Sequence, residues 1–185
     1  IAVSMAHHLR KRKIAFSAAD VSGRALAVAK ENARTNRVED AIAFYESDLF
    51  DGFLRDNRGR PRQRYHWILT NPPYIPTGEM SSLMREVRDH EPAIALDGGE
   101  DGLEIYRRIL AEAPTFLHPE GRMLMEIGWN QAEAVCRIAE ETDAFSAPRV
   151  IRDLAGKDRI VYLVLRKPGK KRKKDLIKQI CCANI

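Results

Sequence analysis

Cysteine is scarce in this chain, and the spacing of the few cysteines excludes the common cysteine-based sites. The chain has 185 residues and three cysteines, Cys136, Cys181 and Cys182, so it contains no CxxC pair for a metal or redox centre. The five histidines are scattered and form no HxxxH pair, so we expect no metal site. This use of cysteine favours a reduced, cytoplasmic setting without structural disulfides.

Long apolar runs are absent as well. The longest strand-like run, Ile160–Leu165, is much shorter than the ~18 residues that a membrane helix needs. The chain opens with an apolar stretch followed by basic residues, which is the reverse of the order in a signal peptide. Hydrophobic residues make up 44% and charged residues 31%, as is typical of a globular domain. We therefore expect a protein with its own core and no membrane partner.

The net charge of +5 is unevenly distributed along the chain. Residues 166–185 carry eight basic and one acidic side chain, a net charge of +7, so the other 165 residues sum to −2. We expect residues 167–185 to be a basic, disordered tail outside a folded domain of residues 1–166. The alternative is a nucleic-acid site, either in this tail or in the arginine-rich loop at residues 55–64.

Short apolar strands alternate with helices along the chain. We expect strands at 14–19, 41–47, 65–70, 121–127, 150–152 and 160–165, and helices at 1–9, 22–36, 80–88, 103–113 and 130–141. The alternation predicts a doubly wound, mostly parallel α/β sheet, in which Ser22 caps the second helix. The link between the last two strands is too short for a crossover helix, so these two strands should form an antiparallel pair.

Polar side chains follow three of the predicted strands. In an open α/β sheet, ligands bind beyond the carboxyl ends of the strands, and Asp20, Asp48 and Asn71 each lie at such an end. Asp20 can accept hydrogen bonds from ribose hydroxyls, or it can simply favour the start of the next helix. Asp48 has the same two interpretations. Leu49 can cover one face of a flat base or lie in the core.

The segment Asn71-Pro72-Pro73-Tyr74 carries the most specific chemistry. The Asn71 side-chain oxygen and the Pro72 carbonyl can each accept one N–H of a planar NH₂ group, and the two prolines fix the loop in advance. Tyr74 can pack on that planar group. Held in this way, the nitrogen presents its lone pair to an electrophile. The segment therefore predicts methyl transfer to an amino or amide nitrogen.

Asp20, Asp48 and Asn71–Tyr74, in this order, resemble the class I methyltransferases that use S-adenosylmethionine. The NPPY segment alone is shared by enzymes that act on DNA adenine, RNA guanine or protein glutamine. More specific segments are similar to the bacterial release factor glutamine methyltransferases, the HemK family, over residues 1–166: EVRDHEPAIALDGGEDGLEIYRRIL, GRMLMEIGWNQ and DLAGKDRIVYLVL. The alternatives are a ribosomal-protein glutamine methyltransferase and an RNA or DNA amino-methyltransferase.

The resemblance implies a substrate, a cofactor and a set of site residues. The substrate would be the glutamine of the Gly-Gly-Gln motif in peptide chain release factors 1 and 2, and S-adenosyl-L-methionine would supply the methyl group. Asn71–Tyr74 would bind the substrate amide, and Asn71 would also lie beside the cofactor. Asp20 would hold the ribose, and Asp48 and Leu49 would flank the adenine. Glu126 ends a predicted strand nearby and is equally consistent with a structural role.

The chain departs from the family pattern at its start. The family has a glycine-rich loop after its first strand, and residues 1–6 resemble the segment on the far side of that loop. We therefore expect the first, central strand to be missing, together with the family's N-terminal helical domain. Loss of a central strand leaves neighbouring strands without ladder partners. From this we infer a fragment of a larger enzyme, itself weak or inactive.

Overall fold

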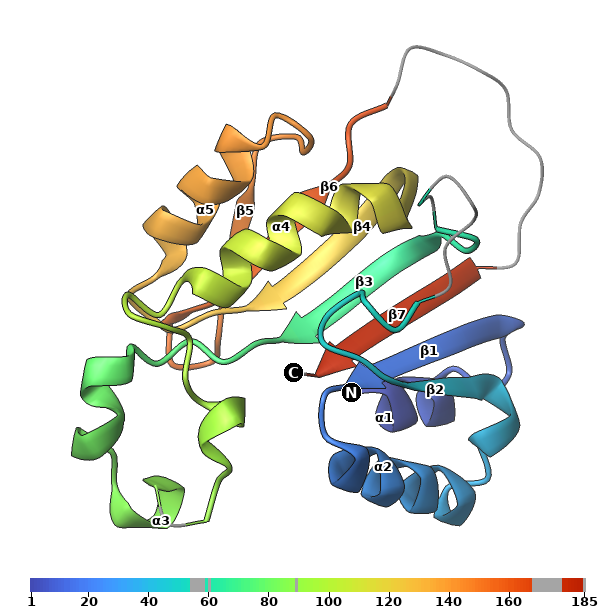
Figure 1. The fold of residues 1–185 in the computed structure, drawn as a ribbon. Coiled ribbons are helices and arrows are strands. Elements are labelled where there is room, and N and C mark those ends of the chain that lie inside the picture. The colour runs from blue at the N-terminus through green and yellow to red at the C-terminus, as the bar shows by residue number, and fades with distance from the viewer. Residues whose placement is uncertain (54–58, 60, 89, 168–177, 185) are drawn as a thin grey trace.

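The centre of the molecule is a seven-stranded, mostly parallel sheet, counted over the described part of the chain (Figure 1). The computed structural model describes residues 1–185 except 54–58, 60, 89, 168–177 and 185. The strand order is β2-β1-β7-β3-β4-β6-β5. The strands are β1 (Ile14–Asp20), β2 (Ile42–Glu46), β3 (Tyr65–Asn71), β4 (Leu117–Glu126), β5 (Arg149–Arg152), β6 (Asp158–Val164) and β7 (Lys178–Asn184).

Helices cover both faces of this sheet, which makes three layers (Figure 1). One face carries α1 (Ala2–His8) and α2 (Gly23–Thr35), and the other carries α4 (Glu104–Phe116) and α5 (Ala132–Glu141). As predicted, the Ser22 hydroxyl caps α2 by accepting from the N–H of Ala25 at 3.2 Å. The helix expected over 80–88 is broken into short pieces. The short helical turns are η1 (Glu39–Ala41), η2 (Thr77–Ser82), α3 (Arg85–Arg88) and η3 (Ala93–Ala95).

The predicted fold class is confirmed. The strands β5 and β6 pair antiparallel, as the short link between the last two predicted strands required, and β6 also pairs antiparallel with β4. The other pairings in the sheet are parallel. Among the described helices, none is long and apolar enough to cross a membrane. In the same part of the chain, no group of three or more His, Cys, Asp or Glu side chains is arranged to hold a metal ion.

The strand β7 takes the central position that the family's first strand would hold, so part of the tail expected to be disordered lies in the sheet. Lys178–Asn184 pairs in parallel with β1 on one side and with β3 on the other (Figure 1). The chain thereby fills the central position in which unpaired backbone is expected from the sequence. The physical reason is that a strand between two parallel neighbours satisfies both of their hydrogen-bond ladders. Residues 168–177, which carry most of the basic run, lie outside the described residues, as do residues 55–58 and 60 of the arginine-rich loop.

The side chains of β7 join the cores on both faces of the sheet. Cys181 is fully buried in the cluster under α4 and α5, which includes Tyr65, Ile68 and Phe116. Cys182 points to the opposite face, as alternation along a strand requires, and is 3% exposed in the cluster with Phe16. Burial raises the pKa of the Cys182 thiol to about 12 and raises that of Cys181 well above its ordinary range. The three cysteines are free thiols.

Two histidines pack together where β3 and β4 begin. The ring centroids of His66 and His118 are 4.4 Å apart. The Nε2 atom of His118 is buried and has no hydrogen-bond partner among the described residues. Burial lowers the pKa of His118 below its ordinary value of 6.5, and the neighbouring His66 and Arg64 act in the same direction. The folded protein therefore resists protonation at His118.

This histidine predicts a loss of stability at mildly acidic pH. The contribution of neutral His118 to the free energy of unfolding is fully present above pH 6.5. It is lost as the pH falls from 6.5 through the lower pKa of the folded state, because the unfolded chain then binds a proton that folded His118 resists. The variant His118→Phe removes this titration and keeps a ring against His66. Its free energy of unfolding in urea, measured from about pH 8 to about pH 5, should vary less with pH than that of the parent protein. Equal pH dependence in the two proteins would contradict this account.

Candidate functional site

Three polar residues end strands at the same level along the carboxyl edge of the sheet. In register, Ala19 of β1 and Thr70 of β3 both pair with Ala183 of β7. Asp20 and Asn71 follow directly and stand two strand spacings apart, about 10 Å. Glu126 ends β4, the neighbour of β3 on its other side. The topology therefore brings Asp20 and Asn71 together with Glu126, while Asp48, which the strand-end argument also predicted here, lines a neighbouring cavity.

These three residues line one cavity of about 520 Å³. Its wall is otherwise formed by Ile1, by the NPPY loop and by the segment that precedes α4, and it carries a third acidic residue, Glu91. Asp20, Glu91 and Glu126 give this wall three carboxylates, and no Lys or Arg side chain is among its described lining residues. A cavity of this composition favours a cationic or neutral ligand over a polyanion.

The loop Asn71–Tyr74 enters this cavity from the end of β3. The Asn71 side chain is exposed, Pro72 and Pro73 are buried, and Tyr74 is half-buried. The prolines lack N–H groups, so the backbone does not continue the sheet. Backbone hydrogen bonding resumes at the residue after the loop, Ile75. Its N–H donates to the Leu96 carbonyl at 3.0 Å, and its carbonyl accepts from the Gly98 N–H at 2.8 Å. The loop is therefore held firmly at both ends, with the Asn71 side chain free to reach a ligand.

Asp20 makes a structural contact at the start of α2 and also borders the cavity that contains Asn71. Its Oδ1 atom accepts from the Ser22 N–H at 2.8 Å, which stabilises the turn into α2. The residue is half-buried and lines the cavity that contains Asn71 and a second one of about 250 Å³ beside α2. The turn uses one carboxylate oxygen, and the residue still borders both spaces. Asp20 is therefore placed to accept from a hydroxyl group of a ligand that spans them.

Asp48 and Leu49 are placed differently from Asp20. The Asp48 carboxylate accepts from Arg108 of α4 at 2.7 Å, and this contact raises the pKa of the Arg108 guanidinium. Asp48 lines a neighbouring cavity of about 490 Å³ that shares Pro73 with the first. The Leu49 side chain is 2% exposed and packs in the main core with Phe50. This burial favours the core interpretation of Leu49 that the sequence left open, and it does not support a contact with adenine.

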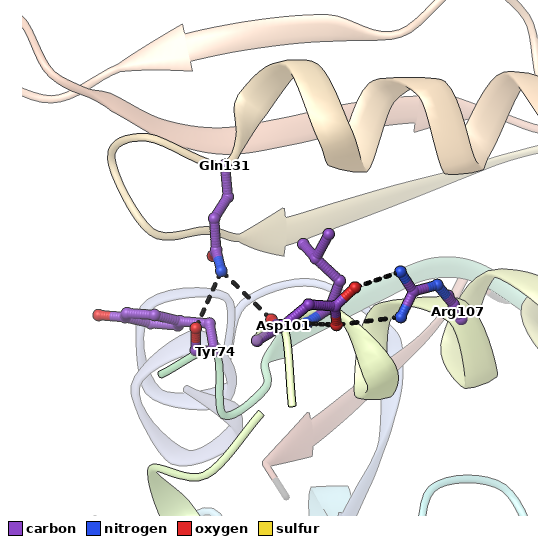
Figure 2. Close-up of polar contacts among 6 residues, drawn as sticks. Tyr74, Asp101, Arg107 and Gln131 are labelled. Atoms are coloured by element: carbon purple, nitrogen blue, oxygen red, sulfur yellow. Dashed lines mark hydrogen bonds and ion pairs between the residues drawn. The ribbon is translucent and has the colours of Figure 1, made fainter. Parts of the chain in front are cut away.

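Two contacts at the site have no counterpart in any sequence motif, and both are shown in Figure 2. The Gln131 amide donates to the Tyr74 carbonyl at 2.9 Å, and Arg107 of α4 donates to Asp101 at 3.1 Å. The Arg107 contact lowers the pKa of the Asp101 carboxyl. Both residues fall inside segments that carry the family resemblance, but neither forms a spacing that points to a role. Gln131 is distinguished only by its contact with Tyr74, which is 57 residues away in the sequence.

Comparison with known proteins places this geometry among methyltransferases. A family model described as the methyltransferase small domain matches residues 1–88. The release factor glutamine methyltransferase of Thermosynechococcus vestitus is 39% identical over 145 residues, 78% of this chain and 48% of that protein. The protein of the same name from Moorella thermoacetica is 40% identical over 159 residues, 86% of this chain and 53% of that one.

Solved structures agree on the fold. A putative methyltransferase from Thermoplasma acidophilum superposes with a TM-score of 0.55 at 10% identity, covering 97% of this chain and 67% of that one. The ribosomal protein L11 methylase of Lactobacillus delbrueckii gives a TM-score of 0.51 at 15% identity, with 89% and 76% covered. The chain spans about half the length of the curated relatives it matches. It has the class I methyltransferase fold and is a homologue of the release factor glutamine methyltransferases.

Proposed function

We propose that this protein transfers a methyl group from S-adenosyl-L-methionine to the side-chain amide nitrogen of the glutamine in the Gly-Gly-Gln motif of peptide chain release factors. The observation that carries this proposal is that the loop Asn71–Tyr74 and Asp20 border one cavity. The loop suits a planar NH₂ group and the aspartate suits a ribose. The substrate class is supported by the relatives, which are release factor glutamine methyltransferases at 39% and 40% identity.

The residues present fit a sulfonium nucleoside. Asp20 lies where acids of nucleotide-binding sheets accept from ribose hydroxyls, at the carboxyl end of β1. The carboxylates of Asp20, Glu91 and Glu126 favour a positively charged ligand in the adjoining space. When bound, the cofactor supplies a methyl group on a positively charged sulfur. The prediction that Asp48 and Leu49 flank the adenine has weaker support, because Asp48 is paired with Arg108 and Leu49 is buried.

The chain's own contribution is to position the amide. Asn71 Oδ1 and the Pro72 carbonyl accept the two N–H groups of the substrate, and Tyr74 packs against the amide plane. An amide nitrogen is a weak nucleophile, so alignment of its lone pair with the methyl group accounts for most of the rate. The nitrogen would accept the methyl group as the carbon–sulfur bond of the cofactor breaks, and its surplus proton would pass to water. This scheme requires no strong general base.

A nucleic-acid amino-methyltransferase is the main alternative that shares NPPY chemistry. The cavity beside Asn71 has three carboxylates and no Lys or Arg among its described lining residues, which is unfavourable for a phosphate backbone. A ribosomal-protein glutamine methyltransferase uses the same amide chemistry. It differs from the proposal only in the protein substrate. The experiment must therefore offer all three substrates.

Transfer of radiolabelled methyl from S-adenosyl-L-methionine tests the proposal directly. We expect label on purified release factor, and none on a release factor whose Gly-Gly-Gln glutamine is replaced by alanine, on total ribosomal protein or on DNA and RNA. The 185-residue chain and any longer protein encoded in frame upstream are assayed side by side. Label on ribosomal protein or on nucleic acid, with release factor unlabelled in both forms, would overturn the assignment.

A further inference from the structure

Gln131 lies at the junction of three loops beside the site. Its side chain is 9% exposed. The Nε2 atom donates to the carbonyls of Tyr74 at 2.9 Å and Gly102 at 3.2 Å (Figure 2). The Oε1 atom accepts from the Gly128 N–H at 3.0 Å. Both amide hydrogens and the amide oxygen are therefore used. One side chain joins the end of the NPPY loop to the turn before α4 and to the turn after β4.

Glycines make this junction close enough to form. A Cβ atom added at Gly102 would lie 2.5 Å from the Tyr74 carbonyl oxygen and 2.9 Å from Gln131 Nε2. A Cβ at Gly128 would lie 2.7 Å from Gln131 Oε1, and one at Gly98 would lie 2.8 Å from the Tyr74 Cα. Gly102 also has a φ of +71°, which favours glycine. The turn before α4 and the turn after β4 therefore both have glycine where a side chain would collide with Tyr74 or Gln131.

Gln131 stands directly before α5, where a side chain usually caps the helix, but its side chain bonds elsewhere. Gln131 is the N-cap residue of α5, yet its side chain makes no capping hydrogen bond to that helix. It turns instead toward Tyr74 and Gly102, which are 57 and 29 residues away in the sequence. A polar side chain that is nine-tenths buried and fully bonded across three loops holds their relative positions.

We infer that Gln131 is a positioning residue, which holds the backbone at Tyr74 so that Asn71 and Pro72 present their two acceptors at the spacing of one amide group. This inference rests on the proposed function for its effect on rate. The contact itself is local and can be measured without any turnover. Without the Gln131 amide, the Tyr74 carbonyl loses this donor, and the loop end is held only by the backbone hydrogen bonds of Ile75 that follow it. A displacement of about 1 Å at a reacting centre can reduce the rate on the order of 100-fold.

Two variants separate donation by Gln131 from its size. Gln131→Glu keeps the shape but places a carboxylate against the carbonyls of Tyr74 and Gly102. Gln131→Met keeps the length and removes both functions. We expect kcat to fall about 10- to 100-fold in both variants, with the KM for S-adenosyl-L-methionine little changed. Burial raises the pKa of the introduced carboxyl, so Gln131→Glu should regain activity relative to the parent near about pH 5.5, where the acid is again a donor. Gln131→Met should not.

The matched control is Gln63→Glu, the same substitution just before β3, at the opposite edge of the sheet from the site. Amide hydrogen exchange is measured in the same proteins. In the Gln131 variants the N–H groups of Ile75, Thr77 and Gly98 should exchange faster than in the parent and the control, while those of β1 and β3 do not change. Hydrogen exchange requires no methyl transfer, so it still tests whether the Gln131 side chain holds the loop at Tyr74 if the proposed function fails. Parent-like exchange in Gln131→Glu, or an active Gln131→Glu with unchanged kcat, would overturn the inference.

Discussion

Replacement of Asn71 by alanine is expected to lower kcat/KM for methyl transfer to release factor by about 10²- to 10³-fold, with the fold intact. The reason is the loss of one of the two acceptors that aim the substrate nitrogen, and such preorganised groups are typically worth this much. Asn71 is exposed at the end of β3, and its role there is not one of packing. The free energy of unfolding should therefore change by no more than about 0.5 kcal/mol.

A second substitution at the same position tests the nature of the contact. Asn71→Asp keeps an oxygen that accepts an N–H, so it should lose less activity than Asn71→Ala. It should still be slower than the parent, because it adds a charge beside three existing carboxylates. The control is Asn36→Ala, which removes an exposed amide that donates to Asn32 at the end of α2, away from the cavity. Initial rates with labelled cofactor are measured in the form of the protein that transfers methyl.

The outcomes separate three roles for Asn71. Loss of rate in Asn71→Ala with partial activity in Asn71→Asp supports an acceptor for the substrate amide. An increase in the KM for the cofactor, with kcat unchanged, would assign the Asn71 side chain to cofactor binding and not to alignment of the substrate amide. Rates within about twofold of the Asn36→Ala control would refute any role of the Asn71 side chain in the reaction.

Local sequence pattern was sufficient for most of the fold. The apolar runs predicted the strands that became β1 to β6, and the Ser22 cap located the start of α2. The prediction of one helix over 80–88 was wrong, because this segment forms two short helical turns, η2 and α3. The strand β7 was missed for a different reason. Its short apolar run stands beside a basic run, and its partners lie far away in the sequence, so nothing local distinguishes it from a tail.

The site shows the same division between local and long-range information. Strand ends converge by topology, so strand order alone was enough to place Asp20 and Asn71 together. The environment of Asp48 depends on Arg108, which is 60 residues away, and Leu49 is drawn into the core by contacts that no spacing reveals. Gln131 is the clearest case, because a single glutamine has no pattern of its own. Its long-range hydrogen bonds exist only in the folded chain.

The central position of β7 predicts that a charge at Cys181 will be far more damaging than the same charge at Cys136. Cys181 is fully buried between β1 and β3, next to the hydrogen bond that Tyr65 donates to Ser17 at 3.1 Å. We expect Cys181→Asp to lower the free energy of unfolding by on the order of 4 kcal/mol, because it buries an unpaired carboxylate. Cys136→Asp, at a partly exposed position of α5, should cost about 1 kcal/mol or less.

Urea denaturation of the 185-residue chain and its two variants measures this difference. Thiol labelling gives a second readout on the unmodified chain, because burial raises the pKa of both thiols of β7 and removes them from solvent. In the folded protein at neutral pH, Cys136 should react before Cys181 and Cys182, and all three should react together in urea. Rapid native labelling of Cys181, with equal stability of the two aspartate variants, would show that β7 does not occupy the sheet. If Cys181 is protected from labelling and Cys181→Asp alone greatly lowers the free energy of unfolding, the strand β7 is an integral part of the core. The sheet that positions Asp20 and Asn71 then depends on this strand.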